Sequence, residues 1–290
     1  MKQENELTIK GEIYNTPFNF YLNNNMYKVS KFRFELPKLD LEFINELNYL
    51  NKDNIGSLQI ISSLKNYKTN YEFNEKFLNF ESNNDKDNNY FYDGSIELKP
   101  FNANVQIKYK DLDLLELFSN KNLFYEIIRS NILINDNLNY DVTLEAQNIK
   151  NHKKLHSLNL KMNFSQGFLN FNNSTLMFRD TAKLELIDGV YIKSLNEESF
   201  YGNLKINIID EKKFYSFLQT NKKYRKNINN LRISFKFDYK KNELILDEIF
   251  IDNVTSSKLK RVMNSFNSDN KGFNNLIDIK KLINQVFKTL

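Results

Sequence analysis

The two histidines of the chain, His152 and His156, lie four residues apart in the segment "NHKKLH". On an α-helix this spacing would place both imidazoles on one face, as in a zinc site with histidine ligands. The segment lies between predicted strands, however, and Lys153 and Lys154 separate the histidines with no acidic residue close by. The sequence therefore favours a solvated turn here, and it predicts no metal and no cofactor.

Three pairs of neighbouring carboxylates could in principle carry general acid–base catalysis. All of them lie at predicted turns or on the polar phase of alternating strands, where solvated carboxylates are ordinary. The chain also has no cysteine, no G-x-S-x-G turn and no glycine-rich phosphate loop. We therefore expect a non-enzymatic protein and keep a glycan-active β-protein as an alternative. The pairs are Asp111 with Asp113, Glu197 with Glu198, and Asp247 with Glu248.

The charge balance does not indicate a nucleic-acid partner. The formal net charge of the 290 residues is +5, from 41 basic and 36 acidic residues that are mixed along the chain. A nucleic-acid-binding domain usually concentrates its basic residues in one patch. The densest basic runs, 221–227 and 258–261, are interpreted as solvated segments.

Alternation of apolar and polar residues is the main structural signal of the sequence. In 230–253, apolar side chains recur at Ile233, Phe235 and Phe237, and the rhythm resumes after "KKNE" at Leu244 and Leu246. Similar runs extend over most of the chain, which predicts a mainly β fold. Helical spacing of apolar residues predicts short helices near 112–130, 211–223 and 256–288.

The C-terminal segment 256–290 is predicted to be helical. Its apolar residues form a stripe at three- and four-residue steps. We expect this stripe to cover one end of the sheet, where open strand edges would otherwise promote aggregation. The stripe consists of Leu276, Ile279, Leu282, Ile283, Val286 and Phe287.

Many large apolar side chains fall on one phase of the predicted strands. They could form the core of a closed sandwich, or they could line a curved sheet whose apolar face is incompletely covered. An open face of this kind suits acyl chains, because each methylene exposed to water costs about 0.8 kcal/mol. The candidate groove residues are Phe18, Phe20, Phe32, Phe34, Ile96, Leu98, Val105, Ile107, Leu160, Met162, Phe164, Leu184, Leu186, Ile206, Ile208, Phe235, Phe237, Leu244 and Leu246.

The sequence resembles the AsmA-like family of bacterial envelope proteins, which includes the TamB-type bridge proteins. The run of short strands in 158–210 and the hairpin "ISFKFDYKKNELILDEIFIDN" carry the resemblance. The segment "YDGSIELKPFNANVQIKYKDLDLLELF" is similar to the strand–PF–strand–helix unit of alphaproteobacterial members. The resemblance implies one elongated region over 1–290, with a sub-boundary near 130. Its expected fold is a twisted, antiparallel, meandering sheet that forms a groove.

The resemblance also implies a function in phospholipid transport or outer-membrane homeostasis. The implied ligands are phospholipid acyl chains, and the implied location is the periplasm. Family members usually carry an N-terminal membrane anchor, but this sequence has no apolar run of the roughly 18 residues that a spanning helix needs. The resemblance therefore implies that contacts with the inner and outer membranes are made by segments outside this chain. The alternative is a structural or interaction protein of the envelope with a closed β core and no lipid ligand.

Overall fold

The computed structural model of the chain is mainly β, as the alternation predicts. It describes residues 4–13, 16–25, 29–48, 54–62, 65–82, 89–114, 139–165, 167–194, 197–268 and 276–289. These residues divide into two compact units, and the division falls within strand β10 (Asn139–Ile149), after Val142. The sub-boundary expected from the sequence, near residue 130, and most of the predicted helix at 112–130 lie outside the described residues.

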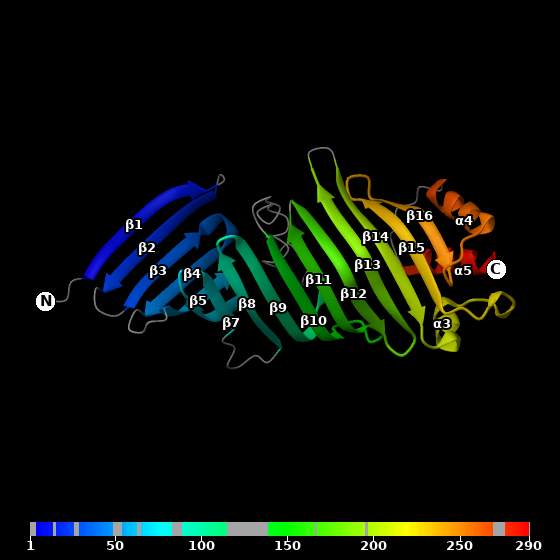
Figure 1. Cartoon of the computed structure of the whole chain (residues 1–290), viewed down its shortest axis with the longest axis horizontal. Coiled ribbons are helices and arrows are strands. Elements are labelled where there is room, and N and C mark those ends of the chain that lie inside the picture. The colour runs from blue at the N-terminus through cyan, green and yellow to red at the C-terminus, as the bar shows by residue number, and fades with distance from the viewer. Residues whose placement is uncertain are drawn as a thin grey trace. The chain divides into compact units, whose positions relative to one another are not determined.

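The first unit is a meander in which each strand pairs with the next one along the chain (Figure 1). Every strand pair from β1 to β9 is antiparallel. A short 3-10 turn, Pro37–Leu39, joins β3 to β4. The strands are β1 (Glu4–Ile13), β2 (Thr16–Asn25), β3 (Val29–Leu36), β4 (Leu41–Asn48), β5 (Asn54–Ser62), β6 (Lys65–Phe73), β7 (Phe77–Ser82), β8 (Tyr90–Leu98) and β9 (Phe101–Leu112).

The second unit combines a further meander with three helices. Its defined strand pairs, from β11 to β16, are also antiparallel. After β10 the strands are β11 (His156–Ser165), β12 (Phe168–Phe178), β13 (Ala182–Lys193), β14 (Glu198–Ile208), β15 (Asn230–Asp238) and β16 (Glu243–Ile251). The helices are α3 (Glu211–Leu218), α4 (Ser257–Ser268) and α5 (Leu276–Lys288), and a 3-10 turn, Lys222–Tyr224, precedes β15.

The hairpin of β15 and β16 has the register that the alternation indicates. Phe235 lies opposite Leu246, and Phe237 lies opposite Leu244. A β-bulge then interrupts the pairing, so that the partner of Ile233 is Ile249. The extra residue on β16 explains why the apolar phase shifts between Leu246 and Ile249 in the sequence.

The helices close a core over one face of the second unit. Helix α3 begins after Asp210, whose Oδ1 accepts a hydrogen bond from the Lys213 amide at 3.0 Å. Its Tyr215 ring lies 5.3 Å from the Phe287 ring of α5, and both side chains are buried. Of the predicted C-terminal stripe, Leu282, Ile283, Val286 and Phe287 are buried in this core, while the side chains of Leu276 and Ile279 lie outside the described set.

Helix α4 also covers the outer edge of β16, the last strand of the meander (Figure 1). The Asn267 side chain binds both backbone groups of Leu246. The Leu246 amide donates to Oδ1 at 2.9 Å, and Nδ2 donates to the Leu246 carbonyl at 2.8 Å. One amide side chain thus takes the place of a neighbouring strand and covers part of an exposed edge.

Replacing Asn267 with Ala is expected to lower the free energy of unfolding by about 1–3 kcal/mol, because it leaves two partly buried backbone groups of Leu246 without partners. Urea unfolding followed by circular dichroism measures the change. The control is Asn264→Ala, an exposed position on the same helix. Equal stability of the two variants would show that the Asn267 contact does not stabilise the edge.

Candidate functional site: an open apolar trough

One face of the first unit is lined by apolar side chains from all nine strands. Successive residues of a strand point to opposite faces, and cross-strand partners share a face. Leu22 lies opposite Phe32, and Phe32 lies opposite Asn45. The same row continues through Leu58 and Thr69. The alternation in the sequence therefore becomes one continuous surface.

Glycines allow aromatic rings to lie flat on this surface. Gly56 faces Tyr71 across the β5–β6 pair, and a Cβ at Gly56 would lie 2.2 Å from the Tyr71 ring. Gly94 faces Phe80 in the same way, and a Cβ there would lie 2.5 Å from that ring. Each ring thus fills the space that a side chain would take on the neighbouring strand. The rings form the floor of a depression instead of projecting from it.

The apolar face of the first unit is only partly covered. Among the described residues of β1 to β8, no hydrophobic side chain is buried, although Phe18, Phe20, Phe32 and Phe34 all point to this face. By contrast, the core of the second unit includes buried side chains from α3, α5 and β13 to β16. A large contiguous apolar surface left open in this way is typical of a binding site.

The uncovered face contains a cavity with a volume of about 860 Å³. This volume lies within the range of roughly 300–1,000 Å³ that is usual for ligand sites. Strands β3 to β9 all contribute to its walls. The lining residues are Ser30, Phe32, Asn45, Leu47, Leu58, Ile60, Tyr67, Thr69, Tyr71, Phe73, Leu78, Phe80, Tyr90, Tyr92, Ile96, Val105, Ile107 and Tyr109. We call this cavity the trough.

The polar groups of the trough are neutral, and four of them bind one another in two pairs. The Tyr71 hydroxyl donates to Asn45 Oδ1 at 2.6 Å, and the hydroxyls of Thr69 and Tyr92 lie 2.5 Å apart. Ser82 Oγ accepts a hydrogen bond from the Tyr92 amide at 3.1 Å. Burial raises the pKa of Tyr92, so its hydroxyl stays protonated at neutral pH. No acidic or basic residue is among the lining residues, which suits an uncharged, apolar ligand.

The predicted groove residues of the first unit lie together on this face. Four of them, Phe32, Ile96, Val105 and Ile107, line the trough itself. Phe18 and Phe20 continue the surface, with ring centroids 5.4 Å from Phe34 and 5.9 Å from Phe32 respectively. Leu98 lies at the end of β8 and is exposed.

The predicted groove residues of the second unit are mostly covered by protein. Those that are buried are Met162, Phe164, Ile206 and Leu246. Phe235, Leu244 and Ile208 are partly buried and pack against the core. Leu160, Leu184, Leu186 and Phe237 are half-buried. Four predicted groove residues of the second unit are therefore buried, whereas none of those in the first unit is.

None of the trough residues contributed by β4 to β7 was among the predicted groove residues. Leu47, Leu58, Ile60, Tyr71 and Phe80 are examples, and they follow the same alternation as the predicted residues. Alternation is present in these strands too, but polar residues such as Asn45 and Thr69 interrupt the apolar positions that face the trough.

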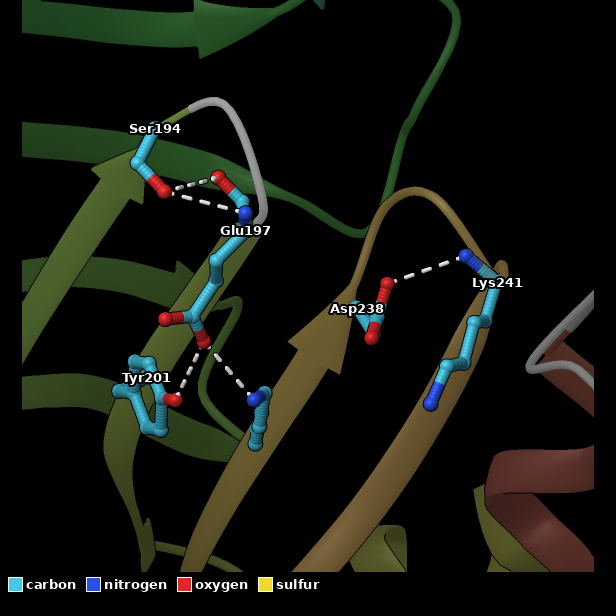
Figure 2. A network of polar contacts seen from close by, with 6 residues as sticks. Ser194, Glu197, Tyr201, Asp238 and Lys241 are labelled. Carbon is cyan, nitrogen blue, oxygen red and sulfur yellow. Dashed lines mark hydrogen bonds and ion pairs between the residues drawn. The ribbon is translucent and has the colours of Figure 1, made fainter.

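The Glu197–Glu198 pair, a candidate for acid–base chemistry, takes part in structural contacts. Figure 2 shows Glu197, which comes immediately before β14, with its carboxylate near Tyr201. One oxygen of its carboxylate accepts a hydrogen bond from the Tyr201 hydroxyl at 2.7 Å and from Lys236 Nζ at 2.9 Å. Glu198 accepts a hydrogen bond from the Tyr191 hydroxyl at 2.9 Å. The Lys236 ammonium, aided by the Tyr201 hydroxyl, lowers the pKa of Glu197 to about 2.

Replacing Glu197 with Gln is expected to make stability less sensitive to acid. Its folded-state pKa, about 2, lies below the usual value of about 4.3. The carboxylate therefore contributes stability above the unfolded-state pKa, and this contribution is lost as the pH falls towards 2. Urea unfolding at several pH values should show a larger loss in wild type than in Glu197→Gln between about pH 4.5 and 2. Glu248→Gln, at an exposed position, is the control, and identical pH profiles for wild type and Glu197→Gln would contradict the prediction.

The two histidines lie at the turn between β10 and β11. His152 accepts a hydrogen bond through its carbonyl from the Leu155 amide at 2.8 Å, and His156 begins β11. In the part of the chain that the structure describes, no group of three or more His, Cys, Asp or Glu side chains could hold a metal ion. The described helices are all too short or too polar to cross a bilayer.

No protein-family model matches the chain, and neither the curated proteins nor the solved structures contain a match.

Proposed function

We propose that the chain is a non-enzymatic, AsmA-like protein of the bacterial cell envelope. In this proposal the trough holds or conducts phospholipid acyl chains, and the protein contributes to phospholipid transport or outer-membrane homeostasis. It works in the periplasm, and segments outside this chain make the membrane contacts.

The observation that carries the proposal is the trough of about 860 Å³ with its uncharged lining. On this face of β1 to β8, the described large apolar side chains are half-buried or exposed, and none of them is buried. An acyl chain laid on this face covers protein and ligand surface together, which is worth about 0.8 kcal/mol for each methylene removed from water. No catalytic group is needed for this function.

A second candidate function is a structural or interaction protein of the envelope with no lipid ligand. The closed core of the second unit supports it, because Leu231, Val286 and Phe287 are almost completely buried there. The two candidates differ in whether the face of the first unit is occupied by lipid.

The proposal is tested by extracting the purified protein with organic solvent and identifying the lipids by mass spectrometry. A fluorescent fatty acid is then titrated and displaced with phospholipids of increasing acyl length. We expect co-purified phospholipid, and a Kd that falls by up to about fourfold for each added methylene until the trough is filled. Absence of lipid together with an affinity that does not depend on chain length would favour the second candidate.

A further inference from the structure

Four segments of the second unit bring basic side chains to one pocket. Lys154 comes from the turn after β10, Arg179 from the turn between β12 and β13, Lys212 and Lys213 from α3, and Lys280 from α5. The pocket has a volume of about 620 Å³. We call these five side chains and the space between them the basic pocket.

The basic pocket concentrates positive charge in a chain that has little excess of it. Its lining includes five cations and a single acid, Asp180, whereas the whole chain has a formal net charge of +5. Lys213 forms ion pairs with Asp180 and with Asp210, the latter at 3.7 Å. Glu211, at the start of α3, is a further acid on this element.

The other four cations form no ion pair with a described acidic side chain. Clustered like charges repel one another, so an anion bound among them would be stabilised.

Three of these cations are already positioned for a ligand. The Nζ atoms of Lys154 and Lys280 lie 5.1 Å and 4.3 Å from the centre of the Phe217 ring, so one ring holds both ammonium groups. That ring packs against Phe178 at 4.5 Å. Arg179 Nε donates to the Lys153 carbonyl at 2.7 Å, which fixes the guanidinium and leaves its two terminal amino groups as donors.

The geometry points to a phosphate-binding site in the basic pocket. Arg and Lys are the side chains that bind phosphate oxygens most strongly, with Arg often in two-point contact. The chemistry fits both the phosphate of an anionic lipid headgroup and a free phosphate compound. The inference does not depend on the trough, because it rests on other residues of the other unit.

The test compares two variants that lose the same charge. The pocket variant carries Lys154→Gln, Arg179→Gln and Lys280→Gln. The control variant carries Lys258→Gln, Lys260→Gln and Arg261→Gln, at exposed positions of α4. Glutamine keeps the first two methylenes of each side chain and a polar end, so it removes the charge and shortens the stem in both variants alike. Thermal melts check folding, and Arg179→Gln alone is the variant to use if the triple change lowers the melting temperature.

Two probes distinguish the sources of phosphate. Inorganic pyrophosphate is titrated by calorimetry at constant ionic strength, and vesicles of phosphatidylcholine with or without phosphatidylglycerol are used in flotation assays. We expect wild type and control to bind at least about tenfold more tightly than the pocket variant, since charged hydrogen bonds are lost. Binding of vesicles that contain phosphatidylglycerol, without binding of pyrophosphate, would identify a lipid headgroup. Binding of pyrophosphate would identify a site open to free phosphate compounds. Binding of neither probe, or equal losses in both variants, would overturn the inference.

Discussion

Leu246→Asp is expected to abolish cooperative folding of the second unit. Leu246 is 2% exposed and belongs to the cluster that α4 and α5 form with β15 and β16. An unpaired carboxylate at such a position costs several kcal/mol, which is comparable to the roughly 5–15 kcal/mol that stabilises a whole domain. We expect a loss of more than about 4 kcal/mol, or no folded second unit at all, in urea unfolding followed by circular dichroism.

The matched control for this change is Ile245→Asp. Ile245 is the adjacent residue, but it lies on the opposite face of β16, is half-buried and pairs with Lys236. The same charge placed there stays hydrated and near a cation, so the loss should be much smaller. If Leu246→Asp melts close to wild type, the face under α4 is accessible to water and the closed core is wrong.

Alternation in the sequence predicted the strands well, because the apolar and polar phases of a strand show which of its two faces is apolar. The hairpin at 230–253 was found from this alternation. The C-terminal helices and the helix at 211–223, which in the structure ends at Leu218, were found from helical spacing. The same pattern does not show whether the apolar face of a strand is covered by other parts of the protein. Val105 and Leu246 both occupy the apolar phase of a strand, yet one lines an open trough and the other lies beneath a helix.

The basic pocket and the edge contact of Asn267 could not be predicted from the sequence for a second reason. Both are made by residues far apart in the sequence, such as Lys154 with Lys280 and Leu246 with Asn267. In a chain rich in Asn and Lys, a single residue of either type carries little information. The two densest basic runs, 221–227 and 258–261, supply none of the basic residues that line the pocket.

Several glycines lie opposite aromatic residues on neighbouring strands. With 7 glycines in 290 residues, each glycine on the apolar phase of a strand is unusual. Gly11 faces Phe18 and Gly202 faces Phe235, as Gly56 faces Tyr71. Once the register is known, these pairs indicate where rings lie flat. The register depends on the length and type of each turn, and the sequence alone does not fix these.

Val105→Asp is expected to remove lipid binding while leaving the fold largely intact. Val105 lies on β9 opposite Gly94, within the lining of the open trough, and it is half-buried. A carboxylate on an accessible surface keeps part of its hydration, so the loss of unfolding free energy should stay within about 1–2 kcal/mol. An acyl chain that covers it must strip that hydration, which should weaken binding at least about tenfold.

Gln106→Asp provides the matched control, because Gln106 is the next residue on the same strand, points to the opposite face and is exposed. Both variants gain one negative charge on β9, so any general effect of charge on the protein is shared. Lipid that co-purifies with wild type and Gln106→Asp, but not with Val105→Asp, would place the acyl chains on the trough face. Retained lipid in Val105→Asp would show that lipid binds elsewhere. Collapse of Val105→Asp in thermal melts, to the extent expected for Leu246→Asp, would mean that the face of the first unit is sealed in solution, and the acyl-chain proposal would then fail on stability alone.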